Sequence, residues 1–191
     1  RDPMSAPAAQ YTDTDYRDFL DASALRGARI GVERSYFGAD PHRDDLMEQA
    51  IVDMANAGAT IIDNADLVNR SRIGAPSYQV LLYEFKTDLE LYFQSVAPEL
   101  NMRTLDDLIA FNEANADREM PWFGQEIVIE AAAKGDLSTP EYLESKETAR
   151  RYSQDEGIDW LMEEHQLDAI VAPTTRSAWK TDLINGGISS L

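Results

Sequence analysis

The chain has 191 residues, 43% of them hydrophobic, and a formal net charge of −18 from 17 basic and 35 acidic side chains. This length suits one domain that buries roughly 70% of its unfolded surface, so a disordered or collagen-like chain is excluded. The excess of acid argues against binding to nucleic-acid phosphates or anionic lipid, because both would be repelled. The absence of cysteine excludes disulfides, thiolate catalysis and cysteine-ligated zinc.

No apolar run approaches the length of a membrane span, and the first residues lack the basic-then-apolar order of a signal peptide. These features predict a soluble protein. We expect it to be cytoplasmic, with a periplasmic location left open.

Residues 1–24 show neither a period of 2 nor a period of 3.6, which predicts an irregular arm. Residues 25–66 predict a strand, a helix and a second strand. The apolar run at 28–33 and the β-branched run at 60–63 are too short for helices, and Asp40 followed by proline is a helix-start signal. Strands joined by such a helix are normally parallel.

Residues 77–166 are predicted to be largely helical. A capping box of Thr104 with Asp107 begins one helix, and Gly157 is expected to interrupt the last long one. The first helix of this segment carries an aromatic-rich stripe along one side, in steps of four and three, at Leu81, Phe85, Leu89, Tyr92 and Val96.

Residues 168–175 begin with an apolar run that predicts a third, buried strand. The fold class is therefore α/β, with the helical segment inserted between the second and third strands. We expect residues 1–191 to form a single unit.

Few residues carry a recognisable chemical motif. The residues around Glu164-His165 come close to a helical zinc pattern, but Leu161 stands where the first imidazole is needed. We expect His165 and His42 to be surface or helix-cap residues, and we predict no metal and no cofactor. Residues 186–190 resemble a glycine-rich loop that presents a serine, but no base follows them, so a flexible loop is favoured.

A more unusual signal is Trp122-Phe123 followed closely by Gln125, two adjacent aromatic residues and an amide near a helix start. Such a corner can line a pocket. Core packing of the two rings is the favoured alternative, which leaves Gln125 as the residue most available to a ligand.

Several stretches, in this order and spacing, resemble the C-terminal half of the amidase signature family, closest to the peptide amidases. The resemblance covers about residues 20–179. The stretches are LRGARIGV (25–32), LYEFK (82–86), LIAFN (108–112), FGQE (123–126), EGID (156–159) and LDAIVAPTT (167–175).

The resemblance implies an amide hydrolase on a mixed sheet with helices on both faces. It implies a nucleophilic serine, a second serine that bridges through a cis peptide, and a lysine base. The family's glycine- and serine-rich signature has no match here, so no catalytic residue is carried over. We expect a fragment truncated at both ends that is inactive alone.

Two functions follow as expectations. In the first, the parent protein hydrolyses a peptide amide or a small linear amide, and this chain shapes the substrate side of the cleft. Ligands of open α/β sheets bind beyond the carboxyl ends of strands. The candidate pocket residues are therefore Trp122, Phe123, Gln125, Thr174 and Thr175.

The second function is an acidic, non-catalytic interaction module, or an amidotransferase-type subunit that shares the fold. For either function the expected partners include neither nucleic acid nor membrane. Because strands 28–33, 60–63 and 169–173 would lack sheet neighbours, we also expect the fragment to self-associate through its exposed sheet.

Overall fold

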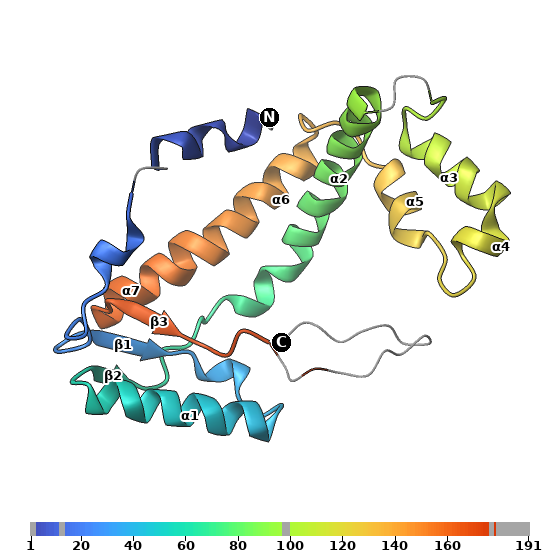
Figure 1. The fold of residues 1–191 in the computed structure, drawn as a ribbon. Coiled ribbons are helices and arrows are strands. Elements are labelled where there is room, and N and C mark those ends of the chain that lie inside the picture. The colour runs from blue at the N-terminus through green and yellow to red at the C-terminus, as the bar shows by residue number, and fades with distance from the viewer. Residues whose placement is uncertain (1–2, 12–13, 97–99, 176–177, 179–191) are drawn as a thin grey trace.

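The computed structural model describes residues 3–11, 14–96, 100–175 and 178, and Figure 1 shows their arrangement. A three-stranded sheet lies at one end of two long helices, and a group of shorter helices lies at the other end. The sheet has the order β2-β1-β3, formed by β1 (Arg29–Val32), β2 (Thr60–Ile62) and β3 (Ala169–Val171). All of its pairings are parallel, which confirms the α/β class and the strands expected from the sequence.

One face of the sheet packs around Gly31. The register pairs Gly31 with Ile62 on β2 and with Ile170 on β3, so these three residues share a face. A Cβ on Gly31 would collide with the side chain of Leu167, which explains the glycine in the central strand. Helix α7 (Trp160–His165) covers this face through the buried Leu161.

Helix α1 (Pro41–Asn56) lies along the opposite face and buries Ile51 (Figure 1). Its start follows the sequence prediction, because Asp40 accepts a hydrogen bond from the backbone N–H of Arg43 and proline occupies the first turn. After the helix, Gly58 adopts a φ of 101°, a conformation that glycine reaches without steric cost.

The segment between β2 and β3 is helical, as predicted. Its capping box at Thr104 and Asp107 is present, with both reciprocal hydrogen bonds formed. Gly157 interrupts the last long helix with non-helical angles, φ −117° and ψ −107°. The elements are η4 (Arg70–Arg72), α2 (Gly74–Val96), α3 (Leu105–Ala114), α4 (Ala116–Glu119), α5 (Glu126–Ala132), α6 (Pro140–Arg150) and the π-helix η5 (Arg151–Asp159).

The stripe of α2 that the sequence pattern defines does not coincide with the buried face of the helix. Leu81 is 52% exposed, whereas Leu82 is fully buried against Leu105 of α3 and Ala131 of α5. Tyr92 and Val96 are also more than half exposed. Periodicity allows either of two adjacent faces, and the position of α3 and α5 decides between them.

Helices α2 and α6 are joined by a reciprocal pair of hydrogen bonds. The Tyr83 hydroxyl donates to Glu141 at 2.6 Å, and the Tyr142 hydroxyl donates to Glu84 at 2.8 Å. The two tyrosine rings lie 5.5 Å apart between these bonds. These contacts fix the position of α2 relative to α6 along the helix axes.

The expected irregular arm contains short regular turns. Residues Pro3–Tyr11 and Tyr16–Phe19 form 3₁₀-helices, η1 and η2. Asp15 caps the second by accepting from the backbone N–H of Arg17. Such i→i+3 turns form locally and need no apolar period, which is why the sequence pattern missed them. A further 3₁₀ turn, η3 (Arg34–Tyr36), follows β1. Across the described ranges, no helix combines the length and apolar character that crossing a bilayer needs.

Candidate functional site

The first candidate region is the carboxyl edge of the sheet. The backbone N–H of Glu33 donates to the carbonyl of Val171 at 3.0 Å, which extends the pairing of β1 with β3 by one residue. Pro173 is buried, and Thr174 and Thr175 then emerge into solvent. The two threonines predicted as pocket residues therefore lie where a ligand beyond the strand ends would meet them.

Two carboxylates organise the loops beside this edge. Glu33 is only 1% exposed, and its oxygens accept from the backbone N–H groups of Ser35 at 2.9 Å and Leu67 at 3.0 Å. Asp66 accepts from the backbone N–H of Arg34 at 2.6 Å. These donors stabilise the buried carboxylate, and Glu33 thereby links the segment after β1 to the segment after β2.

A buried arginine connects α1 to the same edge. Arg43 is 9% exposed and donates to the carbonyl of Tyr36 at 2.6 Å and to that of Thr175 at 3.5 Å. It also donates twice to one oxygen of Asp44, at 2.8 and 3.1 Å. The Arg43 guanidinium holds the pKa of Asp44 below its usual value of 3.8. Sequence reasoning missed Arg43, since a charged residue in a first helical turn normally faces solvent.

The second candidate region is the corner between α4 and α5. Trp122 is 66% exposed and Phe123 is 54% exposed, so the favoured expectation of core packing for these rings is wrong. Helix α5 begins only at Glu126, and its buried contact comes from Ala131, so the two rings lie before the part of the chain that packs against α2 and α3. The two rings offer an exposed aromatic surface.

Gln125 is half-buried and already has protein partners. Its Oε1 accepts from the Asn112 amide at 3.0 Å, and its Nε2 donates to the carbonyl of Ile109 at 3.3 Å. Gln125 therefore ties α3 to the start of α5. A ligand at this corner would meet the two aromatic rings before it met the amide.

The structure does not bring the two candidate regions together. In Figure 1 the α4–α5 corner lies with the short helices, and the end of β3 lies with the sheet, at opposite ends of the long helices. Residues 186–190, the glycine-rich segment weighed as a serine-presenting loop, lie outside the described residues.

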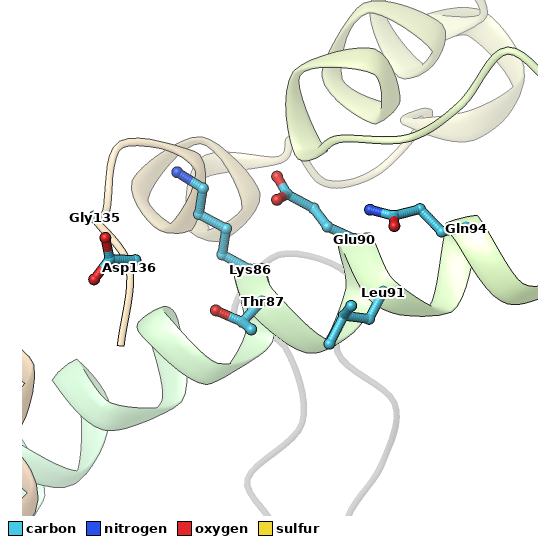
Figure 2. Close-up of a pocket in the computed structure, with 7 residues that line it drawn as sticks. All are labelled: Lys86, Thr87, Glu90, Leu91, Gln94, Gly135 and Asp136. Carbon is cyan, nitrogen blue, oxygen red and sulfur yellow. The ribbon is translucent and has the colours of Figure 1, made fainter. Parts of the chain in front are cut away.

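A cavity of about 340 Å³ lies beside α2, lined by Lys86, Thr87, Glu90, Leu91, Gln94, Gly135 and Asp136. Figure 2 shows Lys86, Glu90 and Gln94 on successive turns of α2, with Lys86 reaching toward the loop of Gly135. The Lys86 ammonium donates to the carbonyls of Ala132 at 2.9 Å and Lys134 at 2.5 Å, and so caps the end of α5.

The carboxylates of this cavity are also engaged within the protein. Glu90 accepts from the backbone N–H of Leu105 at 3.2 Å, and Asp136 accepts from the backbone N–H of Ser138 at 2.8 Å. Lys86 and Glu90 thus hold α5 and α3 against α2, and Asp136 orders the loop that follows α5. Because these groups serve helix packing, the carboxyl edge of the sheet is the better candidate for contact with a ligand.

Comparison with known proteins gives the class of protein. Residues 1–184 match the Amidase family, so the chain belongs to that family, as the sequence resemblance indicated. A probable amidase from Arabidopsis thaliana is 32% identical over 164 residues, which cover 82% of this chain and 30% of the relative.

Solved structures give the same result in three dimensions. The peptide amidase from Stenotrophomonas maltophilia is 37% identical with a TM-score of 0.81, and a peptide amidase bound to the competitive inhibitor chymostatin gives 0.86 at the same identity. Both comparisons cover 100% of this chain and 39% of the other. A glutamyl-tRNA(Gln) amidotransferase subunit from Pseudomonas fluorescens is 27% identical over 185 residues, 94% of this chain and 37% of that protein. The chain therefore spans about a third of the length of the relatives it matches.

Proposed function

We propose that this chain forms the substrate-side wall of an amide hydrolase that acts on a peptide amide or a small linear amide. The observation that carries the proposal is the likeness of the whole chain to a peptide amidase, with a TM-score of 0.86 at 37% identity. Backbone likeness at that identity supports a shared cleft as well as a shared fold. In that cleft, Thr174 and Thr175 would face the substrate from the sheet.

The chemistry we propose is that of the Ser-Ser-Lys arrangement implied by the family resemblance. A neutral lysine takes a proton relayed by the bridging serine, and the nucleophilic serine oxygen then bonds to the amide carbon. Backbone N–H groups stabilise the oxyanion, and collapse of the intermediate breaks the carbon–nitrogen bond as the proton held by the lysine returns to the leaving nitrogen, which departs as ammonia. Water then hydrolyses the acyl-serine ester, which releases the acid and restores the serine hydroxyl. No stretch of the 191 residues resembles the glycine- and serine-rich signature, so these groups would belong to the portion of the relatives that this chain does not span.

The role of the wall residues can be tested in a chimera. The matching segment of the Stenotrophomonas maltophilia peptide amidase would be replaced by this chain, and ammonia release from a peptide amide measured. Loss of a binding contact raises KM, so we expect Thr174→Val to raise KM by about fivefold or more. Thr60→Val is the matched control, because Thr60 is an exposed threonine at the amino-terminal end of β2, away from the carboxyl edge of the sheet.

The α4–α5 corner is tested in the same way. Trp122→Ala should raise KM, while Trp160→Ala, which removes a tryptophan that is 41% exposed on α7, should leave KM unchanged. Unchanged kcat/KM in Thr174→Val, Trp122→Ala and Gln125→Ala for every amide tried would remove the pocket proposal.

An amidotransferase-type subunit is the second candidate, favoured by the likeness to a glutamyl-tRNA(Gln) amidotransferase subunit over 94% of the chain. A hydrolase releases ammonia into solution, whereas an amidotransferase passes it to an acceptor. A chimera that releases ammonia without any added protein supports the hydrolase, and strict dependence on an added partner and acceptor supports the amidotransferase. The gene sequence directly upstream of the Arg1 codon distinguishes the hydrolase from a non-catalytic module. A lysine and a glycine- and serine-rich signature there would support the hydrolase, and their absence would support the module.

A further inference from the structure

Two hydrogen bonds flank the part of the segment that carries Thr174. On one side, Val171 accepts the backbone hydrogen bond from Glu33 at 3.0 Å. On the other side, Thr175 accepts from Nη1 of Arg43 at 3.5 Å. Pro173 lies between these two hydrogen bonds and directly before Thr174, and it has no N–H to donate. The path of the backbone at Thr174 therefore depends on the anchor at Thr175.

Arg43 is itself held in a fixed position. Its Nη2 donates to the carbonyl of Tyr36 at 2.6 Å, and Asp44 accepts from both Nη2 and Nε. The other oxygen of Asp44 accepts from the backbone N–H of Gly38 at 2.6 Å. One guanidinium thus joins the start of α1, the loop after β1 and the segment after β3.

An arginine suits this task and a lysine does not. A guanidinium presents five donors in a planar, rigid fork, whereas an ammonium is a point charge on a flexible stem. With Arg43 this deeply buried, its donors are directed at protein acceptors. Loss of the side chain would leave the carbonyls of Thr175 and Tyr36 without this donor.

We propose that Arg43 is a positioning residue that sets where Thr174 lies in the substrate wall. The inference rests on the proposed function, in which Thr174 faces the substrate. Arg43 acts through the backbone of Thr175 and does not touch the substrate itself. Its substitution should therefore weaken substrate binding more than it weakens the chemical step.

Arg29, at the amino-terminal end of β1, offers a matched control. Arg29 donates to the carbonyls of His165 at 2.9 Å and Gln166 at 2.9 Å, and so ties the start of β1 to the end of α7. Like Arg43, it is an arginine that bridges segments through backbone carbonyls. Arg29→Ala removes a comparable structural tie without touching the carboxyl edge.

The first measurement is hydrogen exchange on the 191-residue chain, which needs no activity. Since loss of an anchor lowers the cost of local opening, we expect Arg43→Ala to speed exchange at the backbone amides of Ala172, Thr174 and Thr175 by about fivefold or more. Arg29→Ala should leave this segment unchanged, and residues 82–86 in α2 should be unchanged in both variants. Unchanged exchange at 172–175 in Arg43→Ala overturns the inference.

The second measurement uses the chimera with the peptide amidase. Because misplacement of a binding group costs affinity, Arg43→Ala should raise KM by about tenfold while kcat stays within about twofold. Arg43→Lys should recover less than half of that loss, and Arg29→Ala should leave KM unchanged. Equal KM values for the Arg43→Ala and Arg29→Ala chimeras overturn the role of Arg43 toward substrate.

Failure of the proposed function has a different signature. An inactive chimera with no substitution overturns the proposed function, and the role of Arg43 toward substrate falls with it. The exchange measurement then still decides whether Arg43 holds the segment that carries Thr174.

Discussion

Leu82 lies where α2 meets α3 and α5, and its side chain is fully buried with Leu105 and Ala131. Its neighbour Leu81 belongs to the same helix but is 52% exposed. The periodicity of the sequence places Leu81 on the aromatic-rich stripe of α2, whereas the structure buries Leu82. Replacing each residue by alanine therefore tests the arrangement of the helical segment directly.

The expected cost of Leu82→Ala has two parts. Removing a fully buried leucine loses about 2 kcal/mol of transfer free energy. The cavity left between three helices adds to this, so the free energy of unfolding should fall by about 3 kcal/mol. For a chain of this size, that lowers the melting midpoint by about 6–12 °C.

Leu81→Ala is the matched control. About half of its side chain already meets water, and alanine favours the helix slightly, so its cost should stay below about 1 kcal/mol. Urea and thermal unfolding followed by far-ultraviolet circular dichroism measure both variants. A Leu81→Ala cost equal to or above that of Leu82→Ala would refute the packing of α2 against α3 and α5.

Three further outcomes are expected. Gly31→Ala should destabilise the chain by about 1–3 kcal/mol in urea melts through its collision with Leu167, whereas Gly74→Ala, where a Cβ meets open space, should cost nothing. The pKa of Asp107 is held below its usual value of 3.8, chiefly by the backbone N–H of Arg103. The ionised Asp107 carboxylate therefore stabilises the folded chain above pH 3.8, and this stabilisation is lost as the pH falls below 3.8. The difference in the free energy of unfolding between the native chain and Asp107→Asn should shrink accordingly below pH 3.8. Because β2 and β3 are the outer strands of the described sheet, sedimentation velocity should show concentration-dependent self-association, and a strictly monomeric chain would contradict this.

Local sequence signals predicted the helix starts well. The Asp40 cap and the Thr104 capping box need only residues within one turn of the chain, and both form as expected. The three strands followed from short apolar runs, and the parallel pairing of the first two followed from the helix between them. Local chemistry decides these features, so sequence alone was sufficient.

The errors concern features that distant segments decide. The choice between Leu81 and Leu82 depends on where α3 and α5 settle, more than 20 residues away along the chain. The exposure of Trp122 depends likewise on how α5 packs, because the buried Ala131 of α5 meets Leu82 of α2 and Leu105 of α3. Arg43 was missed because its acceptor at Thr175 lies 132 residues away in sequence.

Ammonia release by the chimera of this chain with peptide amidase tests the central claim most directly. If the chain supplies the substrate wall of an amide hydrolase, the folded chimera should release ammonia from a peptide amide, and the isolated 191-residue chain should release none in the same assay. A correctly folded chimera without turnover, or an isolated chain that cleaves amides, would contradict the account.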